Sequence, residues 1–244
     1  MLRSAPARAA AAGTPVDRPF VTVDVAIFAI VDGRLQVLLV KRARGEHEPH
    51  PGRWALPGGF VDVERDASLD ACARRKLREK TGVHEEHLEQ LKTVGGPRRD
   101  PRGWSVTTVY FALIPRDRAV VAGGNASDAA WFPVEDEARP RPLAFDHDAL
   151  LQAALERLRA KVEYTVLPAA LLPESFTLPE LQRTFETVLG RELDKSAFRT
   201  RMLSAGVIEE TGEMRADTRR PAVLYRLSAT PAQAMPGTFR KREG

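Results

Sequence analysis

One stretch of the chain, GGFVDVERDASLDACARRKLREKTGV, combines the residue types that bind phosphates and metal ions. It runs from Gly58 to Val83 and joins two glycines, several acids and a predicted helix rich in lysine and arginine that ends at Gly82. Side chains three and four residues apart lie on one face of a helix. Carboxylates on that face would hold Mg²⁺ or Mn²⁺, whereas amines and guanidinium groups would bind an anion. The charges on this face therefore decide which chemistry the stretch can perform.

The stretch resembles the Nudix box, in which a glycine, a glutamate and a terminal Arg-Glu-apolar-any-Glu-Glu-any-Gly run stand at fixed spacing. The matches to that run are Arg75, Leu77, Glu79 and Gly82. Lys76 and Lys80, however, stand where the family has glutamates. The distance from Gly59 to Gly82 is also two residues longer than the family pattern, so the upstream acid is either Glu64 or Asp66. In the family, these acids hold a divalent cation that polarises a pyrophosphate and activates water.

In place of three carboxylates, the helix face presents one carboxylate and two ammonium groups, which changes its charge from −3 to +1. Unit charges a few ångströms apart interact by about 1–4 kcal/mol, so this face should repel a divalent cation. A plain surface helix is a weaker explanation, because Lys76 and Lys80 share a stripe with Leu69 and Ala73, where an amphipathic helix carries apolar groups. We therefore predict a folded domain that requires no cofactor, has lost efficient hydrolysis, and binds a diphosphate through these two lysines.

The alternative is a working hydrolase of the ADP-ribose pyrophosphatase type that depends on Mg²⁺. In that case Glu79 and Glu64 would be the catalytic acids, and Glu79 would be a metal ligand. Asp62 and Asp66 are further candidates for holding the metal. A hydrolysis assay with Mg²⁺ or Mn²⁺ would separate the two interpretations.

Further segments resemble the ADP-ribose branch of the Nudix family. They are Lys41-Arg42, residues 52–62 and residues 100–103. Their arginines are candidates to bind phosphates, because guanidinium groups pair well with oxyanions. Their aromatic residues could stack on a base, as could Phe145, although packing in the core is the competing explanation for each. The candidate ligand-binding residues are Arg42, Arg53, Trp54, Gly58, Gly59, Phe60, Arg75, Lys76, Glu79, Lys80 and Arg102.

The elements around these segments are strands interleaved with two helices, which indicates an α/β class. Strands are predicted at residues 20–31, 35–40, 54–56, 106–114 and 130–134, and helices at 66–81 and 146–162. The charged loop between the second and third strands carries His47 and His50. Without a third ligand nearby, we interpret them as solvated side chains rather than a metal site. The resemblance implies that residues 19–163 form a Nudix-type α/β/α sandwich with a mixed sheet.

Residues 164–228 carry a different pattern. Thr177 and Glu180 form a capping-box signal for a helix at 178–189, and Gly190 ends it. A second helix at 195–204 is followed by a strand at 207–209, a polar loop at 211–221 and a return strand at 222–227. Helix, turn, helix and hairpin is the order of a winged helix-turn-helix.

This second half resembles the winged helix of Nudix-related transcriptional regulators of NAD metabolism. In those regulators the Nudix domain senses a nucleotide such as ADP-ribose, and dimeric winged helices bind an operator. The resemblance therefore implies double-stranded DNA and ADP-ribose as partners, and a homodimer. A structural protein that only binds other proteins is a third interpretation, but it leaves the basic wing unexplained.

The charges of the second half support DNA binding as well. A recognition helix enters the major groove with its N-terminal part, and a wing can reach phosphates or the minor groove. The competing explanation is a small packing domain with a solvated basic face. The candidate DNA-binding residues are Lys195, Ser196 and Arg199 on the second helix and Arg215, Arg219 and Arg220 in the wing.

Composition sets the outer limits. The chain has 244 residues, a formal net charge of +4 and 43% hydrophobic residues, which is ordinary for a globular protein with one or two domains. We expect no membrane partner, because no apolar run approaches the roughly 18 residues of a membrane span. The single cysteine excludes an intrachain disulfide, and the cytoplasm is the default location. Residues 1–18 and 229–244 are predicted to be disordered tails, the second one basic.

Overall fold

The computed structural model describes residues 18–82, 87–115, 129–137, 139–216 and 221–228. Apart from Arg18, both predicted tails lie outside these residues, as do Val83, Arg219 and Arg220. The elements of the first half are β1 (Phe20–Val31), β2 (Arg34–Lys41), β3 (Trp54–Ala55), β4 (Gly58–Phe60), α1 (Leu69–Thr81), β5 (His87–Asp100), β6 (Gly103–Leu113), β7 (Ala129–Pro133) and α2 (His147–Val162). Those of the second half are η2 (Leu167–Leu171), α3 (Leu178–Leu189), α4 (Lys195–Ser204), β8 (Ile208–Arg215) and β9 (Ala222–Leu227).

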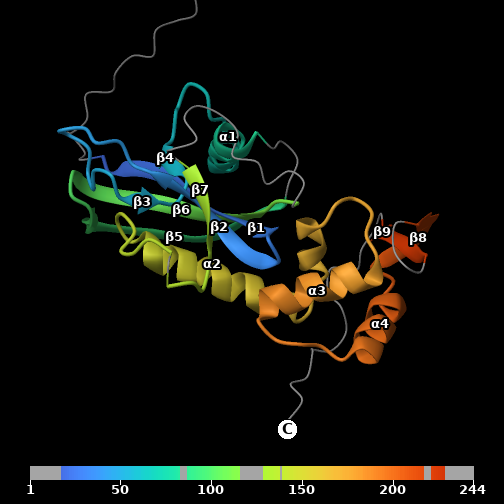
Figure 1. Ribbon diagram of the computed structural model, residues 1–244. Coiled ribbons are helices and arrows are strands. Elements are labelled where there is room, and N and C mark those ends of the chain that lie inside the picture. The colour runs from blue at the N-terminus through green and yellow to red at the C-terminus, as the bar shows by residue number, and fades with distance from the viewer. Residues whose placement is uncertain (1–17, 83–86, 116–128, 138, 217–220, 229–244) are drawn as a thin grey trace, which may run out of the picture.

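A mixed sheet lies between two helices, with α1 on one face and α2 on the other (Figure 1). In the described residues the strands follow the order β3-β2-β1-β6-β5, while β4 pairs with β1 and β7 with β2. β1 runs parallel to β6 and antiparallel to β2, so the sheet is mixed. The predicted α/β/α sandwich is confirmed. Among the described residues, no helix combines the length and apolar character that a membrane crossing requires.

β1 lies at the centre of the sheet and supplies both cores. Residues 22–29 of this strand are all buried. Because successive side chains of a strand point to opposite faces, Val25 and Ile27 pack in the core under α1, while Ala26 and Phe28 pack in the core over α2. The one charged residue within this buried run is Asp24, which the functional site explains.

β5 is an element that the sequence did not predict. It pairs antiparallel with β6 as an outer strand of the sheet, with register shifts between Gln90 and Lys92 and between Gly96 and Asp100. Only two of its residues, Leu91 and Asp100, are buried. The strand therefore lacks the alternation of apolar and polar residues from which strands are predicted.

α1 is shorter than the predicted helix at 66–81. Ser68 caps it by accepting a hydrogen bond from the backbone N–H of Ala71 at 3.1 Å, and Gly82 ends it with φ at 72°. Asp66 therefore precedes the helix. By contrast, α3 and its capping box of Thr177 and Glu180 match the prediction, as does α4.

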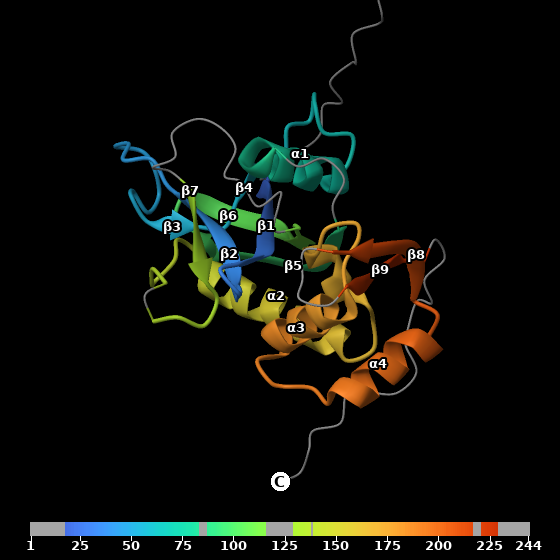
Figure 2. The same ribbon diagram turned by 45° about the vertical axis from the view of Figure 1, so that its right-hand side comes forward.

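The second half is a winged helix, with α3 and α4 followed by the β8–β9 hairpin (Figure 2). β8 continues to Arg215, which corrects the predicted polar loop at 211–221. The strand absorbs this polar segment through a register shift between Glu210 and Met214. The rings of Phe185 and Phe198 lie 5.2 Å apart and join α3 to α4.

The two halves share one hydrophobic core. Leu158 and Val162 of α2 belong to the same buried cluster as Leu181 and Phe185 of α3. This continuity fixes the winged helix to the C-terminal end of α2, as both views show (Figures 1 and 2). A shift of α2 would therefore reach the winged helix directly.

Candidate functional site

A cavity of about 420 Å³ opens where β1, β4 and the β5–β6 turn meet the N-terminus of α2. Residues far apart in the sequence, from Thr22 to His147, line it. The pairing of β4 with β1, for example, brings Gly58 opposite Asp24. The predicted ligand-binding residues that line this cavity are Arg42, Gly58, Gly59, Phe60, Lys80 and Arg102. Its lining does not include Arg53, Trp54, Arg75, Lys76 or Glu79.

The two glycines of the motif are required by their neighbours within the protein. A Cβ atom on Gly58 would lie 2.2 Å from Oδ1 of Asp24 and 2.5 Å from the carbonyl oxygen of Val23. Gly59 has a φ of +147°, and a Cβ atom there would lie 3.1 Å from Nζ of Lys76. Larger residues would therefore displace the buried carboxylate of Asp24 from the cavity wall and the Lys76 side chain from its place over Gly59.

Arg75 organises the acids of the motif. Its Nε and Nη2 atoms donate to the two carboxylate oxygens of Asp66 at 2.7 and 2.5 Å, and its Nη1 donates to Glu79 at 3.0 Å. The side chain of Asp66 is only 2% exposed. The guanidinium of Arg75 holds the pKa of Asp66 well below its usual range. Of the two upstream acids, Asp66 is thus a buried partner of Arg75, whereas Glu64 is exposed.

These residues do not fit a divalent cation. Both Asp66 and Glu79 already pair with Arg75, and Nζ of Lys76 lies 3.8 Å from Glu79. Lys80 adds a second amine at the cavity wall. Among the described residues, no group of three or more His, Cys, Asp and Glu side chains has an arrangement that could hold a metal ion. A Mg²⁺ ion here would lack its usual set of oxygen ligands and would face two amines.

A network of buried charges forms the floor of the cavity. Asp24 accepts hydrogen bonds from Nη2 of Arg99 and from the Thr107 hydroxyl, both at 2.8 Å. Nε of Arg99 donates to Asp146 at 3.0 Å. Nδ1 of His147 accepts the backbone N–H of Leu56 at 2.9 Å, so the proton of the neutral ring sits on Nε2, 3.5 Å from Asp24. Burial lowers the pKa of His147, which favours this neutral form.

Pairs of arginine and aromatic side chains flank the cavity mouth. The guanidinium of Arg102 lies 5.0 Å from the ring centre of Phe60, and that of Arg42 lies 4.8 Å from the ring centre of Phe145. Asp100 fixes Arg102 by accepting two hydrogen bonds at 3.0 and 2.8 Å. Burial alone would raise the pKa of Asp100, but its bonds with Arg102 outweigh burial and lower it. Such surfaces offer charge for phosphates and flat faces for a base.

The remaining predicted ligand residues lie elsewhere in the first half. The indole of Trp54 packs edge-on against Phe132, with ring centres 4.9 Å apart, and Arg53 is exposed on the loop before β3. The two loop histidines do not form a metal site in the described residues; His50 packs against Phe145 at 4.7 Å. The residues that sequence reasoning missed at the cavity are Asp24, Arg99, Asp100 and His147. Asp24 carried a signal, because it interrupts a buried apolar strand.

The predicted DNA-binding residues divide into three groups. Lys195, Ser196 and Arg199 are exposed at the start and middle of α4. Arg215 forms an ion pair with Glu180 of the α3 capping box and so anchors β8 to α3. Arg219 and Arg220 lie outside the described residues. α4 and the hairpin lie on the side of the molecule that faces away from the sheet (Figure 2).

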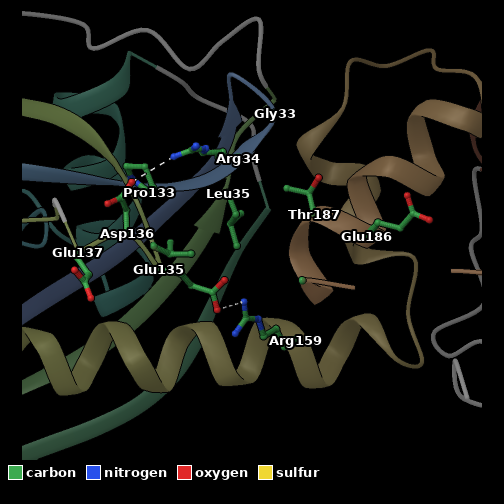
Figure 3. Close-up of a pocket in the computed structure, with 12 residues that line it drawn as sticks. Gly33, Arg34, Leu35, Pro133, Glu135, Asp136, Glu137, Arg159, Glu186 and Thr187 are labelled. Carbon is green, nitrogen blue, oxygen red and sulfur yellow. Dashed lines mark hydrogen bonds and ion pairs between the residues drawn. The ribbon is translucent and has the colours of Figure 1, made fainter. Parts of the chain in front are cut away.

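A second cavity, of about 570 Å³, is lined by residues of both halves of the chain. Figure 3 shows Arg159 of α2 pointing toward Glu135, with which it forms an ion pair of 2.6 Å. Nε of Arg159 also donates to the carbonyl oxygen of Val188 at 3.0 Å, near the end of α3. On the same side of the cavity as Glu135, Arg34 pairs with Asp136 at 3.3 Å, and Thr187 and Glu186 face them from α3 (Figure 3). This cavity therefore borders the joint between the sheet and the winged helix.

Comparison with known proteins covers both halves of the chain. Residues 21–154 match the NUDIX domain family, and residues 168–227 match the NrtR DNA-binding winged helix domain family. The chain is 49% identical over 210 residues to the ADPR responsive transcriptional repressor NtrR of Acinetobacter baylyi. That alignment spans 86% of this chain and 82% of the relative.

Two solved structures are also similar. Shewanella oneidensis NrtR complexed with a 27mer DNA has a TM-score of 0.81 and 41% identity, covering 90% of this chain and 99% of that one. The NUDIX domain of the same NrtR, complexed with ADP ribose, has a TM-score of 0.53 and 43% identity, covering 61% of this chain and 95% of that one. The similarity thus includes the cavity and the winged helix together.

Proposed function

This chain belongs to the Nudix family, in the branch that carries an NrtR-type DNA-binding winged helix domain, and from this premise we propose that it is a transcriptional repressor that responds to ADP-ribose. The observation that carries the proposal is that the Nudix half and the winged helix share one hydrophobic core. A polar cavity flanked by arginine and aromatic side chains packs through α2 onto a winged helix with an exposed cationic helix. The matches to a DNA complex and to an ADP-ribose complex support both partners.

In this proposal the cavity binds the diphosphate of ADP-ribose without a metal ion. Lys80, Arg102 and Arg42 line the cavity and would contact the phosphates, with Lys76 beside Gly59 adding positive charge. In the described part of the chain Lys80 has no ion-pair partner, so its charge is available to a ligand. Phe60 and Phe145 supply aromatic faces for the base or ribose.

The winged helix would bind operator DNA as part of a homodimer. Lys195, Ser196 and Arg199 would enter the major groove from the N-terminal part of α4. Arg219 and Arg220 would contact the backbone from the wing, while Arg215 positions that wing through Glu180. ADP-ribose then changes operator affinity because it binds the two arrangements of the winged helices unequally.

Fluorescence anisotropy tests this function directly. The probe is a labelled duplex that the full-length protein itself selects from a random-sequence library. We expect operator affinity to change by about 5–150-fold on adding ADP-ribose, with EDTA present throughout, and to stay constant with AMP or ribose 5-phosphate. The proposal fails if the protein selects no specific sequence, or if ADP-ribose leaves its affinity unchanged.

The alternative function, Mg²⁺-dependent hydrolysis, has a separate readout. The pairing of Asp66 and Glu79 with Arg75 argues against it, since both acids are already neutralised. Rapid release of AMP from ADP-ribose in the presence of Mg²⁺ or Mn²⁺, abolished by EDTA, would favour the hydrolase.

A further inference from the structure

Arg99 and His147 are two side chains that join the cavity to the start of α2, and Arg99 does so through a charge pair. Arg99 lines the cavity, and its side chain is only 8% exposed. Nη2 binds Asp24 at the cavity floor, and Nε binds Asp146, the residue immediately before α2. Its third nitrogen, Nη1, makes no hydrogen bond to the described part of the chain. One guanidinium group thus holds two protein carboxylates and keeps a donor for a ligand.

Asp146 is held by Arg99 instead of capping its own helix. An aspartate at this position usually accepts a hydrogen bond from a backbone N–H of the first helical turn. Here its side chain makes no such bond, and its Oδ1 atom is buried without a partner among the described residues. The bond from Arg99 to Oδ2 ties the start of α2 to the cavity beside His147, the first residue of the helix, which lines the cavity and accepts the backbone N–H of Leu56.

The opposite end of α2 holds the winged helix. Arg159 binds the carbonyl oxygen of Val188 in α3, and Glu163 pairs with Arg191 at 3.0 Å. Arg201 of α4 donates to the carbonyl oxygen of Glu163 at 2.7 Å. A helix of 16 residues spans about 24 Å, so α2 connects the two sites as one rigid element.

We propose that Arg99 senses an oxyanion of the bound nucleotide and acts as a positioning residue for α2, which carries the state of the cavity to the winged helix. The inference rests on the proposed function and identifies the bond between Arg99 and Asp146 as the contact that changes when the ligand binds. An oxyanion at Nη1 attracts the guanidinium and repels the carboxylate of Asp146, and both effects are strong because water screens charges poorly in a partly buried site. The bond between Arg99 and Asp146 is therefore weaker when ligand is bound, which shifts the balance between positions of the start of α2 while His147 and Asp148 keep their own bonds.

The test measures a coupling factor, the ratio of operator dissociation constants with and without saturating ADP-ribose, in the full-length protein. Asp146→Asn keeps the size of the side chain but removes the charge that Arg99 holds. We expect this variant to bind ADP-ribose within about threefold of wild type and to lose most of the coupling, so that the factor approaches one. Loss of folded protein would lower both affinities but would leave their ratio unchanged.

Asp148→Asn is the matched control. Asp148 lies in the same first turn, but it binds the backbone N–H of Leu143 at 2.7 Å and Arg139 at 3.2 Å, away from the cavity. This variant should keep the wild-type coupling factor. Equal loss in both variants would assign the effect to helix stability and overturn the inference.

Arg99→Lys provides an independent arm, because lysine keeps the positive charge but cannot hold two carboxylates and a ligand in one plane. We expect weaker ADP-ribose binding, by about tenfold, together with loss of coupling. If either Asp146→Asn or Arg99→Lys keeps the wild-type coupling factor, the proposed role of Arg99 is wrong, while the proposed function is unaffected. Absence of coupling in the wild type overturns the proposed function, and this inference with it.

Discussion

Nζ of Lys76 lies over Gly59, about 3.1 Å from the position that a Cβ atom would take on that glycine. The side chain is only 16% exposed, and its ammonium group lies behind Gly59, a glycine that lines the cavity. Lys76 and Lys80 occupy positions at which the Nudix box has glutamates. The helix that would hold a metal in a hydrolase therefore brings amines to the same place.

Restoring acids at these positions should make ligand binding depend on metal. We expect Lys76→Glu combined with Lys80→Glu to weaken ADP-ribose binding in EDTA by more than about tenfold, because two ammonium groups that attract the diphosphate are replaced by two carboxylates that repel it. Mg²⁺ should recover part of this affinity. Isothermal titration calorimetry with and without Mg²⁺ measures both effects. Arg78→Glu, which reverses one charge at an exposed position of α1, is the control for each single substitution and should leave binding unchanged.

The pair of Asp66 and Arg75 should stabilise the fold in a pH-dependent manner. Folding lowers the pKa of Asp66, so its contribution is fully present above the pKa of the unfolded state, near 4, and is lost as pH falls toward the lower pKa of the folded state. We expect the free energy of unfolding to fall between pH 5 and about pH 3, and Asp66→Asn to reduce this slope. The variant should also destabilise the fold at neutral pH, because Arg75 then keeps Glu79, which is partly exposed, as its charged partner.

Asp70→Asn controls for the removal of any ion pair on α1. Asp70 accepts a bond from Arg74 at 2.9 Å, but both side chains are about half exposed. Such pairs contribute only about 0.3–0.5 kcal/mol. Urea unfolding of the three proteins from pH 7 to pH 3 checks the prediction, and an Asp66→Asn variant as stable as Asp70→Asn would contradict it.

Gly58→Ala should damage both the cavity and the fold. Its methyl group would clash with Oδ1 of Asp24 at 2.2 Å and with the carbonyl oxygen of Val23 at 2.5 Å, and overpacking typically costs about 1–3 kcal/mol. Because Asp24 holds Arg99, we also expect ADP-ribose to bind about tenfold more weakly. Gly96→Ala on β5 is the matched control, since a Cβ atom there meets nothing within 4 Å. Thermal unfolding measures the stability of the variants, and calorimetry measures their affinity for ADP-ribose. Wild-type values of both in Gly58→Ala would contradict the prediction.

Local signals predicted most of the elements. The capping box of Thr177 with Glu180 located α3, and Asp194 located α4, because these interactions form within a few residues. β5 was missed because its position depends on pairing with β6 and not on an apolar pattern of its own. The polar end of β8 was missed for the same reason, since β9 supplies its backbone partners.

Only some of the residues that line the cavity could be predicted from the sequence. Residues of the box and its flanks were found from their types and spacing, but Asp24 and Arg99 are 75 positions apart and meet only because β1 and β5 flank β6. Spacing along the chain carries no information about such a pair. A lone aspartate inside a buried strand was the available signal, because a buried charge requires a partner.

The exposed cations of α4 should control operator binding and nothing else. We expect Lys195→Ala combined with Arg199→Ala to weaken operator binding by at least about tenfold, because base contacts contribute about 1–3 kcal/mol each and phosphate contacts release counterions. The slope of the logarithm of the binding constant against that of salt concentration should become shallower by about one for each phosphate that the protein no longer neutralises. Both side chains project from the winged helix, so ADP-ribose affinity should stay at the wild-type value.

The control for this double variant removes two positive charges from the other half of the chain. Arg65 and Arg78 are exposed beside and on α1, far along the chain from α4, so their replacement by alanine lowers the net charge equally. If general attraction to DNA were responsible, both double variants would weaken operator binding alike. If α4 is the recognition helix, only Lys195→Ala with Arg199→Ala does so, and the discrimination between the selected operator and a scrambled duplex falls with it. Anisotropy titrations at three salt concentrations separate these outcomes, and equal weakening would mean that operator contacts lie outside α4.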